Sequence, residues 1–323
     1  MNSFGRFFRV HIFGESHGEG TGICIDGCPE GIPLSLDDFT ADLNRRKSGA
    51  RGTTPRIEAD MPEILSGVYR DCTTGAPITI LFRNENTRSS DYGRFMAVPR
   101  PGHADFSGYK KFNGFNDPRG GGHFSGRITL GIVAAGVVAK KIISPVNIEA
   151  VLAKVGGSED IQAKIEEVLA ENDSVGGLIR CRISGLPAGT GNPFFDSVES
   201  VLSHILFSIP GVKGVEFGAG FDAANMKGSE HNDSFVSPEG ETLTNNAGGI
   251  NGGISNGNDI TVNIAVKPTS SIGREQKTFN FETREMDVLK AGGRHDACIA
   301  LRIPVIVEAA SAIALADLLF AKK

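Results

Sequence analysis

Runs of apolar residues along the chain alternate irregularly between the spacing of strands and that of helices. Alternating or β-branched runs predict strands over 10–12, 22–26, 63–68, 76–82, 146–155, 177–184, 212–217 and 260–266. Helical spacing predicts helices over 36–46, 126–143, 159–171, 196–209 and 305–320. The order lacks the strict strand–helix alternation of a doubly wound parallel sheet. We therefore expect an α+β fold in one domain, 1–323, with sheets packed together and helices outside.

Local signals refine the ends of two predicted helices. Ser35 followed by Asp38 predicts a capping box at the start of the helix over 36–46. Asp196 followed by Glu199 predicts the cap of the helix over 196–209.

The last apolar stretch, 305–320, contains Glu308 and Asp317 and is too short to span a bilayer. We interpret it as a buried helix with Pro304 near its first turn. The first ten residues have no apolar core of signal-peptide length.

Composition narrows the class of partner. A net charge of −5 argues against nucleic acid and membrane surfaces as partners. Arginines are nevertheless dense between Arg45 and Arg127, and glycine is abundant, 42 of 323 residues. A basic site in an acidic chain, with backbone able to approach a ligand closely, suits a small anionic ligand.

The five cysteines are scattered and odd in number, which is typical of reduced thiols in a cytoplasmic protein. Cys24 and Cys28 could form half of a metal site, but no second pair follows them, so we expect no metal.

Two histidines stand in tight turns that contain glycine. His17 lies in the segment Gly-Glu-Ser-His-Gly, 14–18, where a histidine could reach a ligand and transfer a proton. From these residues alone, a solvated turn histidine is the more frequent explanation. His103 follows Arg100-Pro101-Gly102 at the head of a predicted helix, where it could face a ligand or merely cap the helix.

A basic loop that contains Arg45, Arg46 and Arg51 closes the first predicted helix. Cations there complement the dipole at the helix C-terminus, which is a purely structural role. Alternatively they clamp an anion, because a guanidinium group fits phosphate and carboxylate oxygens.

Three glycine-rich segments could approach a ligand. Residues 119–122, Arg-Gly-Gly-Gly, could wrap a phosphate or a ring edge or form a flexible loop, and an RNA-binding RGG element fits poorly in an acidic chain. Residues 248–255 lead by a strand to 267–271, whose lysine and hydroxyls suit a phosphate-bearing cofactor. Residues 218–223 match a dinucleotide fingerprint, but the residues that follow are typical of a loop, so we reject that site.

Asp296 closes the segment Gly-Arg-His-Asp, 293–296, with Arg302 downstream. Such a group is most often a structural ion pair, and in a cleft it could act as a positioned base.

Together and in this order, these motifs resemble the chorismate synthase family. The segments GESHG, RRK…R, RPGHADF, RGGG…R, GGINGGIS, KPTSS and GRHD…R…VEA span residues 5 to about 312 at family-like spacing. The resemblance implies a homotetramer of αββα-type layered subunits, each with one FMN. It also implies a monofunctional lyase of aromatic amino acid biosynthesis. Such an enzyme converts 5-enolpyruvylshikimate 3-phosphate to chorismate by anti-1,4-elimination of phosphate and needs FMN that is reduced elsewhere, ultimately by NAD(P)H.

The resemblance also implies roles for individual residues. His17 would protonate the reduced flavin, His103 would serve the proton balance of substrate or flavin, and Asp296 would assist proton removal. The substrate's phosphate and carboxylates would be held by Arg46, Arg51, Arg100, Arg127 and Arg294. The FMN contacts would come from His123, Phe124, Ser125, Pro210, Gly211, Gly252, Lys267, Pro268, Thr269, Ser270, Ser271 and Arg294.

Two other classes compete with this interpretation. A nicotinamide-dependent oxidoreductase predicts NAD(P)H binding without flavin and a helix after Gly220. A non-enzymatic binder of phosphorylated ligands predicts ligand binding that is unaffected when His17, His103 or Asp296 is changed to alanine.

Overall fold

Two antiparallel sheets form the frame of the protein in a computed structural model that describes residues 1–54, 58–85, 94–291 and 295–321. The first sheet has the strand order β1 (Ser3–Phe4), β2 (Arg9–Gly14), β3 (Gly20–Asp26), β7 (Ile78–Arg83), β4 (Pro62–Ser66). The second has the order β10 (Val212–Phe217), β13 (Ile260–Val266), β9 (Gly177–Ser184), β8 (Asn147–Val155). The α+β class with mainly antiparallel sheets is therefore confirmed.

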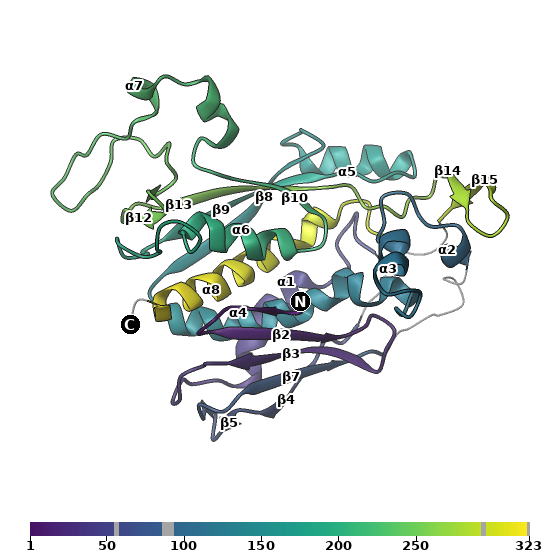
Figure 1. The fold of residues 1–323 in the computed structure, drawn as a ribbon, viewed down its shortest axis with the longest axis horizontal. Coiled ribbons are helices and arrows are strands. Elements are labelled where there is room, and N and C mark those ends of the chain that lie inside the picture. Colours follow the sequence, from purple (N-terminus) through teal and green to yellow (C-terminus); the bar gives the residue numbers. More distant parts are fainter. Residues whose placement is uncertain (55–57, 86–93, 292–294, 322–323) are drawn as a thin grey trace.

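The helices α4 (Thr129–Ile143) and α8 (Pro304–Ala321) lie between the two sheets (Figure 1). They pack so closely that a Cβ built on Gly136 would lie 2.3 Å from the Cβ of Ala309. The order of layers thus differs from the expected one, in which helices lay outside packed sheets. The physical reason is that both helices are buried on nearly every side, and such a helix needs apolar cover on both faces.

By length and composition α8 could cross a membrane, but most of it is buried inside the protein, as is typical of a core helix. Its Asp317 lies near the start of the chain. One carboxylate oxygen of Asp317 accepts hydrogen bonds from the backbone N–H groups of Arg6, Phe7 and Phe8, at 2.8, 2.6 and 2.9 Å. This carboxylate ties the approach to β2 to the central helix.

The capping signals are correct for one helix and one residue off for another. Asp38 accepts from the backbone N–H of Ser35 at 2.7 Å before the 3₁₀ turn Leu36–Phe39 and α1 (Thr40–Arg46). The cap of α6 (Val198–Ser208) is Ser197 and not Asp196. Ser197 has the extended backbone that a cap requires, whereas Asp196 forms an ion pair with Arg6 at 2.7 Å.

A small lobe beside the frame contains α2 (Arg94–Ala97), α3 (Asp105–Lys111) and the hairpin β14 (Glu275–Asn280)–β15 (Glu285–Lys290). Its own apolar cluster joins Phe95, Val98 and Leu289. The lobe supports the segment between α2 and α3, where Arg100 and His103 stand.

The remaining elements are short or lie on the surface. Helix α5 (Ile161–Ala170) packs on β8, and the segment 218–223 leads into the 3₁₀ turn Gly220–Asn225 and the four-residue α7 (Gly228–His231). The long helix that a dinucleotide fingerprint requires does not follow there. The other short strands are β5 (Val68–Tyr69), β6 (Cys72–Thr73), β11 (Ile250–Asn251) and β12 (Ile254–Ser255).

Candidate active site

A cavity of about 940 Å³ opens between the start of α4, the end of α1, the small lobe and the start of α8. This volume is near the upper end of the range for small-molecule sites, ~300–1,000 Å³. The predicted site residues that line it are Arg46, Arg100, His103, His123, Phe124, Ser125, Arg127, Pro210, Gly211, Lys267, Pro268, Thr269, Ser270, Ser271 and Asp296.

The triple-glycine turn separates the two predicted catalytic histidines. A Cβ built on Gly120, whose φ is +61°, would lie 2.1 Å from Nδ1 of His17. A Cβ on Gly121, whose φ is +81°, would lie 3.5 Å from Nε2 of His103. Both positions favour glycine for their backbone conformation, and the first also needs it for space. The turn therefore makes room for His17, which is 7% exposed, on one side and His103 on the other.

Arg100 is brought to the cavity, but most of its donors are already used. Its Nε and one terminal nitrogen donate to the two oxygens of Asp105, each at 2.8 Å, and its other terminal nitrogen donates to Oγ of Ser271 at 3.0 Å. The guanidinium also lies over the ring of Phe95, 4.3 Å from its centre. These contacts fix the turn that carries His103.

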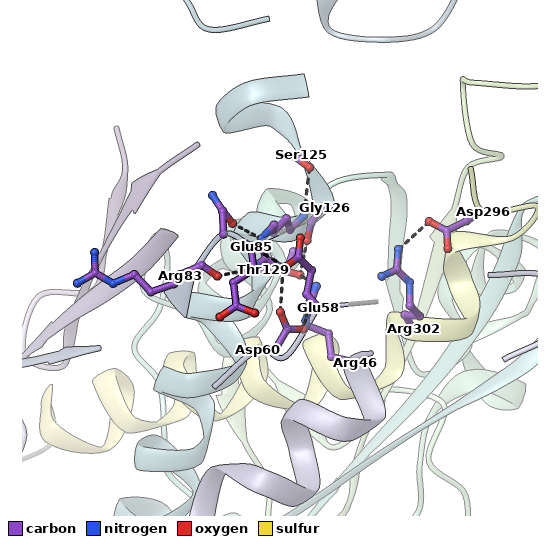
Figure 2. A network of polar contacts seen from close by, with 12 residues as sticks. Arg46, Glu58, Asp60, Arg83, Glu85, Ser125, Gly126, Thr129, Asp296 and Arg302 are labelled. Carbon is purple, nitrogen blue, oxygen red and sulfur yellow. Dashed lines mark hydrogen bonds and ion pairs between the residues drawn. The ribbon is translucent and has the colours of Figure 1, made fainter. Parts of the chain in front are cut away.

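Two buried arginines, Arg46 and Arg127, share the carboxylate of Asp60. Figure 2 shows Arg46 and Asp60. The carboxylate of Asp60, which is 5% exposed, forms ion pairs with Arg46 at 3.0 Å and with Arg127 at 2.8 Å. Burial raises the pKa of Asp60, but the two arginines outweigh burial and hold this pKa below its usual value. Burial lowers the pKa of Arg46 to about 10, so its guanidinium is still charged at neutral pH.

A second ion pair stands at the start of α8. Arg302 donates to one oxygen of Asp296 at 2.6 Å (Figure 2). The backbone N–H of Thr54 donates to the other oxygen at 2.9 Å. Among the described residues, the buried Nε atoms of Arg302 and Arg46 have no hydrogen-bond partner. Buried donors are rarely left without partners unless a ligand or water completes them.

The turn over 267–271 supplies one cation and several hydroxyls to another part of the cavity. Lys267 donates to Oγ of Ser270 at 2.9 Å and to the carbonyl of Gly102 at 2.5 Å. Burial and the neighbouring Lys213 lower the pKa of Lys267. Oγ1 of Thr269 is buried without a partner among the described residues. Two lysines and a free hydroxyl fit an anionic group such as a phosphate.

The start of the chain and the end of β2 both contact His123 at one side of the cavity. Nδ1 of His123 donates to the carbonyl of Gly14 at 2.8 Å, and its Nε2 lies 3.1 Å from Oδ1 of Asn2. The ring of Phe124 packs near Phe112, with 6.2 Å between ring centres.

Three predicted site residues in the described part of the chain do not line this cavity, and a fourth is not described. The first is His17, which lies against Gly120 at the border of the cavity. Arg51 extends to Glu166 on α5, with donors at 2.8 and 2.7 Å, and is largely exposed. Gly252 lies in the turn between β11 and β12. Arg294 lies outside the described residues.

Sequence reasoning missed several charged residues of the site. Asp60 stands in a segment without a motif, at a φ of +52°, and Lys213 is the second residue of β10. Asp105 was part of a quoted motif, but nothing in the sequence indicated that it would contact His103. Its spacing of two residues from the histidine was the only available signal.

The thiols and carboxylates do not gather into a metal centre: in the ranges that the structure describes, no three His, Cys, Asp or Glu side chains stand close enough. Burial also raises the pKa of Cys28 to about 11, which keeps this thiol protonated.

A large, arginine-lined cavity that contains His103 and Asp296, with His17 against the glycine turn at its border, is built on this α+β frame. Such a site defines an enzyme that acts on a small molecule. Comparisons with known proteins agree. The model of the chorismate synthase family matches residues 8–320. The chorismate synthase of Chitinophaga pinensis is 59% identical over 98% of this chain and 96% of its own length. That of Dehalococcoides mccartyi is 45% identical, with the same shares covered.

Among solved structures, a crystal structure of chorismate synthase superposes with a TM-score of 0.75 at 26% identity, covering 99% of this chain and 93% of that one. The chain belongs to the chorismate synthase family. Enzymes of this family are lyases of the shikimate pathway.

Proposed function

We propose that this chain converts 5-enolpyruvylshikimate 3-phosphate to chorismate by anti-1,4-elimination of phosphate, with reduced FMN bound in the same cavity. The observation that carries the proposal is the convergence of buried guanidinium groups with unpartnered donors on a cavity that also holds His103 and Asp296. The substrate carries two carboxylates and a phosphate, so a site for it needs several such donors.

The residues present fit an FMN group. Its phosphate would be held by Lys267, Ser270 and the unpartnered hydroxyl of Thr269, and the turn over 123–125 would border its ring. Bound there, reduced FMN supplies electron density that eases the loss of phosphate without net oxidation or reduction.

The chain's own residues bind the substrate and move protons. Arg46 and Arg127, oriented by Asp60, bind its anionic groups. The reaction breaks one C–O bond, which releases phosphate, and one C–H bond, which releases a proton. Asp296, held by Arg302 and the backbone of Thr54, receives that proton, and His17 and His103 hold and return protons on opposite sides of the glycine turn.

An anaerobic assay tests the proposal. Purified protein is mixed with chemically reduced FMN and 5-enolpyruvylshikimate 3-phosphate, and the absorbance of the diene product is followed. Product should form with reduced FMN and not with oxidised FMN or without flavin. Absence of product, with FMN binding confirmed in parallel, would overturn the assignment.

We further propose a single catalytic domain that is monofunctional, cytoplasmic and homotetrameric. One continuous apolar cluster that reaches from both sheets to α4 and α8 supports the single domain. Oxidised FMN with NADPH should give no sustained turnover with the protein alone, and turnover would contradict the dependence on external reduction. Sedimentation analysis measures the oligomeric state.

A further inference from the structure

His103 contacts a carboxylate on its own turn. Its Nδ1 lies 2.6 Å from Oδ1 of Asp105. Both atoms would be hydrogen-bond acceptors if Nδ1 carried no proton, and two acceptors repel each other at this distance. The proton therefore lies on Nδ1 and is donated to Asp105.

Arg100 fixes the carboxylate of Asp105 in turn. Its backbone N–H and its Nε both donate to Oδ2, at 3.0 and 2.8 Å, and a terminal nitrogen donates to Oδ1 at 2.8 Å. The side chain of Asp105 is 9% exposed and that of Arg100 is 4% exposed. Burial raises the pKa of Asp105, but the hydrogen bonds from Arg100 and His103 outweigh burial and hold it well below its usual value.

We propose that Asp105 is a positioning residue for the proposed reaction: it holds the proton of His103 on Nδ1, so that Nε2 is the atom that exchanges protons at the site. Nε2 faces the glycine turn, since a Cβ on Gly121 would lie 3.5 Å from it. A buried carboxylate that orients an imidazole in this way fixes its tautomer and stabilises its charged form. The inference rests on the proposed function for its catalytic consequence but not for the tautomer.

The other groups around His103 do not supply this orientation. Tyr109 and Asp117 border the small cavity behind the ring, and Asp117 forms its ion pair with Arg119 at 2.8 Å. Lys267 bonds the carbonyl of Gly102. A terminal nitrogen of Arg100 lies 3.1 Å from Nδ1 and has a second N–H beside the one that it donates to Asp105. The shorter contact of Nδ1, 2.6 Å to the carboxylate, decides the position of the proton, because two acceptors would repel each other at that distance.

The geometry predicts what Asp105→Asn would do. Two donors of Arg100 converge on the position of Oδ2, so the amide oxygen takes that position and the amide nitrogen takes the position of Oδ1. That nitrogen is a donor and faces Nδ1 of His103, which must then accept. The proton of the neutral ring moves to Nε2, and the tautomer is inverted.

The experiment reads the tautomer directly. Histidine-labelled protein is titrated to mildly alkaline pH, and ¹⁵N NMR distinguishes protonated from unprotonated ring nitrogens. His103→Gln identifies the signals of His103 among the seven histidines. The wild type should show Nδ1–H and Asp105→Asn should show Nε2–H. A wild type with Nε2–H, or a variant with an unchanged tautomer, would overturn the proposal.

Kinetics give the second readout. In Asp105→Asn, kcat should fall about 10²–10⁴-fold, the scale of a lost general acid–base, with a far smaller change in the Kd of FMN. The matched control is Asp287→Asn, which removes an exposed Asp–Arg pair in the same lobe and contacts no histidine. It should change neither tautomer nor kcat.

If Asp105→Asn retains wild-type kcat, Asp105 does not serve the reaction. If the wild type itself forms no product, the proposed function fails while the tautomer remains measurable.

Discussion

Arg45 and Arg46 are consecutive residues of α1, yet they join two ionic clusters of different character. Arg45 makes two bonds of 2.7 Å to Glu308 of α8, and these raise its pKa. Glu308 also accepts from Lys140 and from the backbone of Ala150, both at 3.1 Å. In this scaffold cluster every carboxylate oxygen of Glu308 is used inside the protein.

Arg46 belongs to the cavity cluster of Asp60, Arg127 and Arg302. Burial lowers its pKa, the positive charges of Arg302 and Arg127 lower it further, and its Nε has no partner among the described residues. The protein thus satisfies the charge of Arg45 and leaves that of Arg46 incompletely satisfied. The difference teaches that an incompletely bonded buried cation, and not a buried cation as such, marks the ligand site.

The largest expected effect comes from a carboxylate beside the cavity cluster. Asp296→Asn should lower kcat about 10²–10⁴-fold, as for loss of a general base, and leave binding of FMN and substrate near normal. Steady-state kinetics with reduced FMN and flavin titration measure the two quantities. The control is Asp42→Asn: Asp42 belongs to the scaffold cluster through ion pairs with Lys140 at 2.7 Å and Arg45 at 3.5 Å, and this variant should retain kcat. Normal turnover in Asp296→Asn would remove Asp296 from the mechanism.

The next effect concerns stability. Glu308→Gln should lower the free energy of unfolding by about 2–4 kcal/mol, because it leaves Arg45 and Lys140 without their buried partner. KM and kcat should stay within about twofold of wild type at low temperature. Denaturant unfolding measures the change. A large change in kcat or KM in this variant would show that the scaffold cluster also serves the active site, and would contradict the distinction between the two clusters.

Substituting the two neighbouring arginines one at a time tests the difference between Arg45 and Arg46. Arg46→Gln should raise the KM for 5-enolpyruvylshikimate 3-phosphate about 10- to 100-fold, the scale of one lost charge-assisted hydrogen bond, and change stability by less than about 1 kcal/mol. Arg45→Gln should do the reverse, with normal KM and lower stability. Equal effects of the two substitutions on KM would show that the site does not depend on which arginine faces the cavity.

The smallest effect is in the acid dependence of stability. Burial raises the pKa of Glu308, but Arg45, Lys140 and the backbone of Ala150 outweigh it and lower the pKa below the unfolded value. Its contribution to stability is therefore complete above about pH 5 and is lost as pH falls through the lowered folded-state pKa. Between pH 5 and pH 3, the free energy of unfolding should therefore depend less on pH in Glu308→Gln than in the wild type. Denaturant unfolding at each pH measures this dependence. Parallel dependence would assign the acid sensitivity to other groups, such as Asp60.

Regular elements were the most predictable part of the fold. The strands Gly177–Ser184 and Ile260–Val266 coincide with their predicted ranges, because each buries alternate apolar residues. The hairpin β14–β15 was missed since its strands are mainly polar and half exposed. The order of layers was not predicted. The spacing of apolar residues shows which face of a single helix or strand is buried, but it does not show which other elements pack against that face.

For the site, the motif residues converge because each stands at the end of a regular element or in a glycine turn. Arg51 carried the same signal as Arg46 but extends to Glu166 on the surface. Asp60 and Asp105 carried no distinguishing signal, since their significance comes from the partners that the fold brings to them.

The position of α8 has a consequence for the newborn chain. Ribosomes deliver residues in order, so this helix, against which α4 and the second sheet pack, emerges after every strand has been made. Until then the second sheet and one side of α4 lack this apolar cover and are exposed to association with other chains. Final closure of the core is therefore expected only after α8 has been made, later than the formation of either sheet.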